Sequence, residues 1–315
     1  MIARPHRPQR PQRRAPAPNA TATVVTMVQE GWLAGHVRAW PAATVAVGVT
    51  DAAATVAVTG PTDRVLPLAS VTKLLVAMAC WVALEEETLR LDEPAGPPGS
   101  TIRHLLAHAS GLAPDEARVL AAPGTRRIYS NAGFEVLGAH LEAASGLTVA
   151  TYLAEAVFEP LRCRHSTLEG SPAHAGRGTL DDLLAIGREL LAPRLVHHST
   201  WLAATRPQFP DVAGVLPGFG YQNPNPWGLG VEVRGRKTPH WTGRRNSTAT
   251  FGHFGRSGAF LWVDPVAGLA VAGLGDLPFG PWAATAWPQL SDAVLAELRP
   301  AASPASWPAG RDAPP

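Results

Sequence analysis

The chain has few lysines, few cysteines and no long apolar run, and each shortage argues against a particular class of protein. Only two lysines, Lys73 and Lys237, stand beside 25 arginines, and the formal net charge is +2, so the composition does not indicate a nucleic-acid partner. Two cysteines, Cys80 and Cys163, are too few for a disulfide framework. The longest apolar run, 74–84, is too short to span a bilayer and is typical of a buried helix, so no membrane insertion is expected.

The two ends of the chain differ in composition from the residues between them. Residues 1–20 are rich in proline and arginine and residues 300–315 in proline and alanine, so we expect both to be disordered. Residues 21–299 are expected to form the folded domain. The start carries the pair Arg13-Arg14, but residues 20–28 are weakly apolar and show no convincing cleavage site. We therefore expect a cytoplasmic protein, with export from a different true start as the alternative.

Hydrophobic periodicity predicts helices and strands in a definite order. Helical spacing covers 21–38, 70–88, 102–107, 132–145, 148–158, 180–191 and 282–298. Runs rich in β-branched residues predict a hairpin at 43–49 and 54–58, and later strands at 227–233, 259–263 and 269–273. This order predicts an α/β fold of the α+β kind, with a mixed or antiparallel sheet from both chain ends and flanking helices. An all-helical lobe is expected as an insertion at about residues 75–215.

The scarce lysine Lys73 lies three residues after Ser70, where a long apolar helix is predicted to begin. A helix start places partial positive charge and free N–H groups beside the serine. A lysine one turn on lies along the same face and can take up or relay the serine proton. Unlike arginine, a desolvated lysine can lose its proton near neutral pH. The alternative is a helix-capping Ser70 with a surface lysine.

A second candidate box, Tyr129-Ser130-Asn131, lies between a Pro-Gly turn and a predicted helix. A buried tyrosine near a lysine can act as a general acid or base, and an asparagine can hold a substrate carbonyl or the lysine. The alternative is an ordinary asparagine cap with a packed tyrosine.

A third box, His253-Phe254-Gly255, is predicted on a strand. Glycine lets a backbone approach a ligand closely. The N–H of Arg256 can then join that of Ser70 as an oxyanion hole. Taken alone, His253 favours a structural role.

In this order the three boxes resemble those of the serine β-lactamase/penicillin-binding-protein superfamily, most closely its class C-like branch. The resemblance covers about residues 22–298 and includes the segments 101–112, 157–161 and 269–274. It implies a mixed sheet flanked by helices, a helical lobe, and an acyl-enzyme on the motif serine, with no metal or other cofactor.

The resemblance also implies roles for the residues of the first two boxes. Ser70 is the nucleophile and Lys73 is its proton partner. Tyr129 is the general base for acylation and the acid for the leaving group, while Asn131 orients Lys73 or the substrate.

In the third box, His253 and Gly255 occupy the strand positions, and the N–H groups of Ser70 and Arg256 bind the oxyanion. Here the chain departs from the best-known β-lactamases, which carry lysine where this chain has His253. A mostly neutral imidazole attracts a substrate carboxylate less strongly and lowers the pKa of Tyr129 less, which argues against β-lactam hydrolysis. Family esterases and peptidases carry His or Trp at this position.

Two segments just upstream imitate the third box. Lys237-Thr238-Pro239 lacks the glycine, and Trp241-Thr242-Gly243 fits the esterase variant. We prefer His253 because a glycine, a strand and an Asp-Pro pair follow it at the family's spacing. Trp241 and Trp227 are then expected to lie in loops that flank the cleft and line the pocket. No Glu-x-x-Leu-Asn box is present, so a class A-type deacylating glutamate is not expected.

Four other histidines are candidates for a metal or catalytic site. His104 and His108 are spaced to share a helical face, which is metal spacing, but no glutamate stands between them, so a structural role is preferred. His197 and His198 are predicted in a solvated loop.

The sequence therefore predicts a metal-independent serine hydrolase that forms an acyl-enzyme on Ser70 with a small ester or amide, of the esterase or D-amino-acid peptidase type. One alternative is an exported β-lactamase or D,D-carboxypeptidase. Another is a penicillin-binding or sensor module that acylates without turnover. The expected partner is a small-molecule ester or amide, and we expect a monomer, with an oligomer left open.

Overall fold

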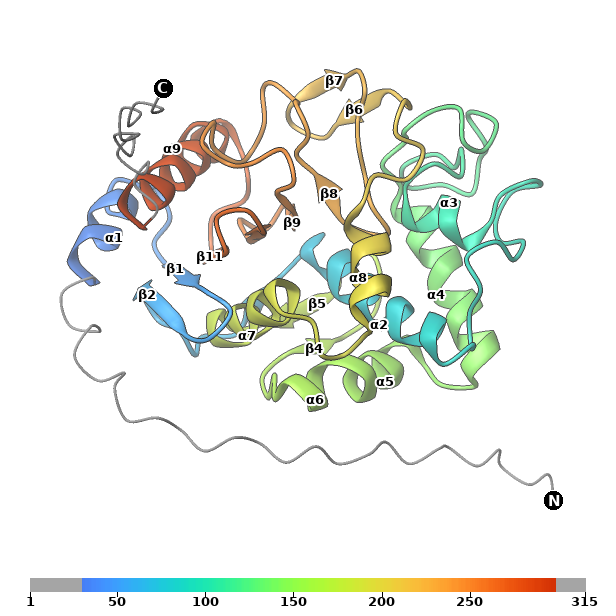
Figure 1. Cartoon of the computed structure of the whole chain (residues 1–315), viewed down its shortest axis with the longest axis horizontal. Helices are drawn as coiled ribbons and strands as arrows, with labels where there is room; N and C mark the ends of the chain where they lie inside the picture. The colour runs from blue at the N-terminus through green and yellow to red at the C-terminus, as the bar shows by residue number, and fades with distance from the viewer. Residues whose placement is uncertain (1–29, 299–315) are drawn as a thin grey trace, which may run out of the picture.

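The computed structural model describes residues 30–298 and is built around a six-stranded antiparallel sheet (Figure 1). The strands are β1 (Val45–Thr50), β2 (Thr55–Thr59), β8 (Glu232–Val233), β9 (Phe251–Phe254), β10 (Phe260–Asp264) and β11 (Leu269–Gly275). Their order across the sheet is β2-β1-β11-β10-β9-β8. Strand β1 pairs with both β2 and β11, so early and late segments form one sheet. The predicted hairpin and the predicted sheet from both chain ends are confirmed.

Both faces of the sheet are covered by helices. Neighbouring residues of a strand point to opposite faces, so each strand contributes side chains to two cores. Val47 and Val271 pack in one core with helices α1 (Glu30–Val37) and α9 (Pro281–Leu298). Ala46 and Ala272 face the other core, which contains α7 (Leu180–Leu191). A Cβ on Gly48 would lie 2.7 Å from Leu184 of α7, so the helix packs directly on the strand backbone.

Helix α2 (Val71–Glu85) runs through the middle of the molecule and is buried over residues 71–83. It contacts β9 on one side, and α4 (Asn131–Ser145), α5 (Val149–Leu153) and α8 (His198–Thr205) on others. A helix that is apolar all round must be buried in this way. The predicted buried helix at 74–84 is confirmed, and its N-terminal end lies where the sheet and the helices meet.

Short elements connect these parts. They are α3 (Ile102–Leu106), a π-helical turn η1 (Ala154–Phe158), α6 (Glu159–Leu161), a small sheet of β3 (Leu66–Pro67), β5 (Gly176–Gly178) and β4 (Thr167–Leu168), and a hairpin of β6 (Gly214–Leu216) and β7 (Gly220–Gln222). Within residues 30–298, no helix is both long enough and apolar enough to cross a membrane.

Three sequence-based boundaries were wrong. The strand predicted at 227–233 is ladder-paired only at 232–233, with Trp227 in an isolated bridge. The single helix predicted at 148–158 is divided into α5 and η1. His198 begins α8 instead of lying in a loop, because the imidazole of His197 accepts the N–H of Ser199 and caps the helix. The arm, the tail and the first half of the helix predicted at 21–38 lie outside the described residues.

Candidate active site

Ser70 occupies a tight turn directly before α2. The preceding residue, Ala69, has φ of 45°. This left-handed conformation is uncommon for a residue with a side chain, and it persists only where the surroundings hold it. The Ser70 side chain makes no capping hydrogen bond to α2. The alternative of an ordinary capping serine is therefore not what the structure shows.

Lys73 lies one turn further along α2 and is fully buried, with 0% of its surface exposed. Its Nζ lies 3.4 Å from Ser70 Oγ, 2.5 Å from Asn131 Oδ1 and 2.8 Å from the carbonyl oxygen of Ala173. Burial lowers the pKa of Lys73 to about 7. A large fraction of Lys73 is therefore a neutral amine beside Ser70 at neutral pH, and the alternative of a surface lysine is excluded.

Asn131 connects this lysine to a carboxylate. Its Oδ1 accepts from Lys73, and its Nδ2 donates to Asp115 Oδ1 at 2.6 Å. The cap of α4 is Ser130, whose Oγ accepts the N–H of Gly133 at 2.9 Å, so Asn131 is not an ordinary cap. Burial is the main cause of the lowered pKa of Lys73, and the negative charge of Asp115 opposes it.

Tyr129 packs within a group of rings beside Lys73. Its ring centroid lies 4.6 Å from that of His108 and 5.8 Å from those of Trp227 and His253, and Lys73 Nζ lies 4.7 Å from it. Burial raises the pKa of Tyr129, so the phenol keeps its proton at neutral pH. Within residues 30–298 its hydroxyl has no hydrogen bond of ordinary geometry.

Strand β9 brings Gly255 against the turn that carries Ser70. A Cβ on Gly255 would lie 2.3 Å from the carbonyl oxygen of Leu68 and 3.2 Å from the Ser70 nitrogen. No residue with a side chain fits there without moving the turn. In the described part of the chain, the N–H groups of Ser70 and Arg256 have no backbone acceptor.

His253 is a neutral residue of this site. Its Nδ1–H donates to the carbonyl oxygen of Phe254 at 2.8 Å, so Nε2 carries the lone pair. Nε2 is buried and has no partner among the described residues. Burial and then the positive charge of Lys73 lower the pKa of His253 to about 3. The imidazole therefore offers an acceptor, and no positive charge, to a ligand.

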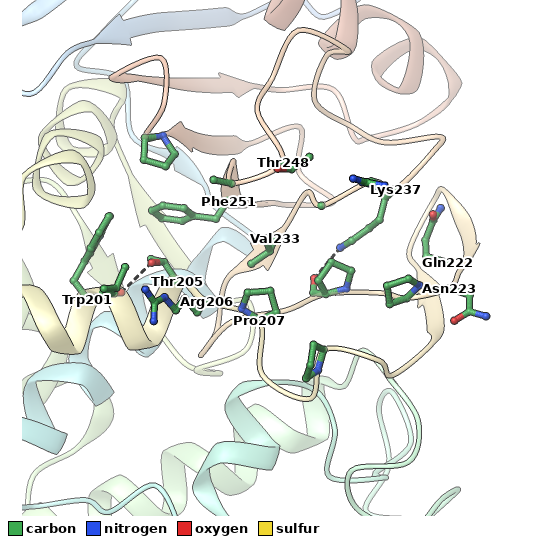
Figure 2. Close-up of a pocket in the computed structure, with 18 residues that line it drawn as sticks. Trp201, Thr205, Arg206, Pro207, Gln222, Asn223, Val233, Lys237, Thr248 and Phe251 are labelled. Atoms are coloured by element: carbon green, nitrogen blue, oxygen red, sulfur yellow. Dashed lines mark hydrogen bonds between the residues drawn. The ribbon is translucent and has the colours of Figure 1, made fainter.

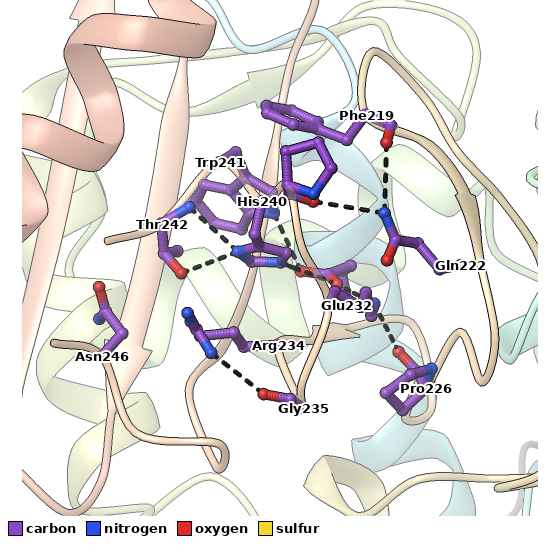
Figure 3. Close-up of polar contacts among 12 residues, drawn as sticks. Phe219, Gln222, Pro226, Glu232, Arg234, Gly235, His240, Trp241, Thr242 and Asn246 are labelled. Atoms are coloured by element: carbon purple, nitrogen blue, oxygen red, sulfur yellow. Dashed lines mark hydrogen bonds and ion pairs between the residues drawn. The ribbon is translucent and has the colours of Figure 1, made fainter. Parts of the chain in front are cut away.

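The two tryptophans predicted near the cleft lie in different surroundings. Trp227 is buried among the rings, 4.7 Å from His108 and 5.6 Å from His253 between centroids. Trp241 is also buried, but its indole N–H donates to Glu232 in a separate polar group (Figure 3). Trp227 thus lies with the other candidate residues, and Trp241 does not.

His108 belongs to the site although the sequence did not select it. The prediction that His104 and His108 share a helical face was wrong, because α3 ends at Leu106 and His108 has φ of 53°. His108 Nδ1 accepts the N–H of Ser130 at 3.1 Å, which fixes the box that contains Tyr129. The available sequence signal was that His108 lies in the segment 101–112, which follows the predicted nucleophile helix. The backbone turn that orients its ring leaves no recognisable residue pattern.

Arg127 is a second residue that the sequence reasoning missed. Its guanidinium is buried and donates to four backbone carbonyls, of Ala107, Gln208, Phe209 and Asn225. These bonds tie the segment before Tyr129 to the loop that precedes Trp227. Arg127 lies in an isolated bridge with Gly214, and a single arginine outside a helix or strand gives no sequence signal for this role.

A cavity of about 640 Å³ lies next to the polar group of Trp241 and apart from Ser70 (Figure 2). Trp201, Val233 and Phe251 give it apolar walls, and Pro226 and Lys237 also line it. None of the predicted catalytic residues borders it. Among residues 30–298, no group of three or more His, Cys, Asp or Glu side chains is arranged to hold a metal ion.

The chain belongs to the Beta-lactamase family, whose model matches residues 27–295. A crystal structure of a beta-lactamase, Mb2281c, from Mycobacterium bovis is 51% identical, covers 84% of this chain and 99% of its own, and superposes with a TM-score of 0.83. EstCE1, described as a hydrolase with promiscuous acyltransferase activity, shares the fold at 18% identity, with a TM-score of 0.69 over 84% of this chain and 98% of its own.

A curated relative is more distant. The D-alanyl-D-alanine-carboxypeptidase/endopeptidase AmpH of Escherichia coli is 26% identical over 152 residues, covering 36% of this chain. The match spans 40% of that relative's length. The fold and family of the chain are those of the beta-lactamases, whose members are hydrolases.

Proposed function

We propose that this chain is a serine hydrolase that forms an acyl-enzyme on Ser70 and hydrolyses a small ester or amide, of the esterase or D-amino-acid peptidase type. The observation that carries the proposal is the buried Lys73, whose pKa is about 7 and whose Nζ lies 3.4 Å from Ser70 Oγ. A base with a pKa near the working pH is the most effective proton acceptor.

Acylation begins when neutral Lys73 takes the Ser70 proton and Oγ attacks the substrate carbonyl carbon. The N–H groups of Ser70 and Arg256 are proposed to bind the oxyanion, since neither has a backbone acceptor in the described chain. Tyr129 gives its phenolic proton to the leaving oxygen or nitrogen and recovers a proton from Lys73. The C–O or C–N bond breaks, and the Ser70 ester remains.

Water completes the cycle by the reverse path. Lys73 and Tyr129 again accept and deliver protons, the Oγ–carbonyl bond breaks, and the carboxylic acid leaves. The raised pKa of the buried Tyr129 favours Lys73 over tyrosinate as the base, which differs from the role that the family resemblance implied for Tyr129.

The neutral His253 favours uncharged substrates. β-Lactams and peptides that end in D-alanine carry a carboxylate, and the neutral imidazole offers it no positive charge. The name of the 51% identical structure and that of the curated relative keep a second candidate in view, a β-lactamase or D,D-carboxypeptidase.

A substrate panel with a time course separates these candidates. p-Nitrophenyl esters, a chromogenic cephalosporin and D-alanyl amides are compared by kcat/KM, and a fluorescent penicillin is followed on the protein. We expect turnover of the esters or of the D-alanyl amides to exceed that of the cephalosporin. Faster cephalosporin turnover would favour a β-lactamase, and a persistent penicillin adduct without turnover of the esters or amides would favour a sensor module.

A further inference from the structure

The second lysine of the chain lies at the centre of a buried polar group that the proposed reaction does not use. Lys237 is 3% exposed and Glu232 2% exposed. Lys237 Nζ forms an ion pair with Glu232 and donates to the carbonyl oxygen of Pro226 at 2.9 Å. Both segments that imitate the third catalytic box, at 237–239 and 241–243, reach this one carboxylate, through Lys237 and through Trp241. Figure 3 shows Trp241 beside Glu232.

The Glu232 carboxylate is fully hydrogen-bonded. It accepts from Lys237, from His240 Nε2 at 2.9 Å and from Trp241 Nε1 at 2.9 Å. The N–H of Thr242 donates to His240 Nδ1, so the proton of that ring is on Nε2. Burial opposes ionisation of Glu232, but His240 and Lys237 outweigh it and hold its pKa well below the usual range. We call these three ionisable residues, Glu232, Lys237 and His240, the buried cluster.

The buried cluster is joined to the catalytic rings through Trp227. Lys237 binds the carbonyl of Pro226, the residue before Trp227, and its Nζ lies 5.8 Å from the Trp227 ring centroid. Glu232 pairs through its backbone with Trp227 in an isolated bridge and with Gly252 of β9, next to His253. Trp227 in turn contacts the rings of Tyr129 and His253.

Lys237 also lies between the 640 Å³ cavity and Trp227. It lines the cavity (Figure 2), while its Nζ lies 5.8 Å from the Trp227 ring centroid. No catalytic candidate borders that cavity. Removal of this side chain would open the cavity toward Trp227 and, behind it, toward Tyr129.

We propose that Glu232, Lys237 and His240 are positioning residues of the active site, which hold Trp227 against Tyr129 and His253 and close the catalytic side from the cavity. A buried ion pair adds little net stability compared with well-packed apolar residues, but it fixes one geometry. The fixed element here is Trp227. The proposal rests on the proposed function, because it assigns the cluster to the acylation site of Ser70.

The test compares Lys237→Met with Lys237→Arg, each also made in a Trp227→Ala background. Active sites are counted by fluorophosphonate labelling, and kcat for p-nitrophenyl butyrate is expressed per labelled site. We expect K237M to lose about tenfold or more in kcat, K237R to keep most of it, and the loss to shrink to about twofold when Trp227 is absent. An equal loss with and without Trp227, or no loss, would overturn the proposal. If K237M does not fold, the double variant E232Q/K237M, which removes both charges together, replaces it.

A second readout keeps the inference separate from the proposed function. In protein labelled with 5-fluorotryptophan, the Trp227 resonance is assigned by Trp227→Phe and that of Trp40, which contacts Trp282, by Trp40→Phe. We expect K237M to broaden or split the Trp227 signal and leave Trp40 unchanged. A sharp Trp227 signal in K237M would overturn the positioning role, whereas failure of the wild-type protein to label at Ser70 would overturn the proposed function alone.

Discussion

The side-chain nitrogen of Lys73 lies 3.4 Å from the hydroxyl oxygen of Ser70, one turn along the same helix. The serine stands before the first residue of α2 and the lysine within its first turn, so the helix geometry itself sets this distance. Burial then lowers the pKa of Lys73 to about 7. Position and proton affinity together suit the pair to the roles of nucleophile and base that we propose for it.

The acylation rate should therefore rise with pH through about 7, as Lys73 loses its proton and becomes a base. Asp115 opposes the lowering of this pKa by burial, so Asp115→Asn should move the rising limb of a kcat/KM profile toward lower pH. Glu116→Gln, in the same exposed loop, is the control and should leave the limb in place. If the rising limb does not move in D115N, the limb does not report the pKa of Lys73.

Removal of the Tyr129 hydroxyl should affect poor leaving groups most. The phenol is buried and keeps its proton, so we expect Tyr129→Phe to lose about 10²–10⁴-fold on an alkyl ester, which needs an acid at the leaving oxygen. A p-nitrophenyl ester, whose leaving group needs no proton, should lose much less. Equal losses on the two esters would contradict the acid role.

Gly255→Ala should impair acylation without a comparable loss of fold. The added Cβ would meet the Leu68 carbonyl oxygen at 2.3 Å and force the Ser70 turn to move. Gly35→Ala is the matched control, because a Cβ there meets nothing within 4 Å. We expect the fluorophosphonate labelling rate to fall more than about tenfold in G255A and to stay unchanged in G35A.

A permanent charge at position 253 should change substrate preference. His253 is neutral, with a pKa of about 3, so His253→Lys supplies the cation that the strand box lacks. We expect kcat/KM for carboxylate-bearing amides and β-lactams to rise relative to that for neutral esters. His253→Gln keeps the site neutral and serves as the control, and an unchanged ratio in H253K would show that charge at this position is irrelevant.

Much of the fold could be predicted because periodicity records burial. The apolar run of α2, the hairpin of β1 and β2 and the helix α7 all lie where the sequence places them. Short strands such as β8 were missed or misplaced, since two paired residues leave no repeating pattern. The division of the 148–158 helix was missed for a similar reason, as a π-helical turn has no pattern of its own.

The candidate site was predictable where residue type carries the chemistry, and unpredictable where backbone geometry does. Ser70, Lys73 and Tyr129 are reactive types at a recognisable spacing, and the structure brings them together. His108 joins them only because it adopts φ of 53° after α3 ends. Trp241 was misjudged because a tryptophan in a loop looks the same whether it lines a cleft or donates to a buried carboxylate.

The central claim is that Ser70 becomes acylated with Lys73 as its base, and mass spectrometry of a covalent adduct tests it most directly. The wild-type protein, Ser70→Ala and Lys73→Arg are treated with a fluorophosphonate, digested, and the modified peptide is sequenced. We predict one adduct on Ser70 in the wild type, none in S70A, and labelling slowed by about 10²-fold or more in K73R, because arginine cannot give up its proton. An adduct on another residue, or labelling of K73R at the wild-type rate, would contradict the account.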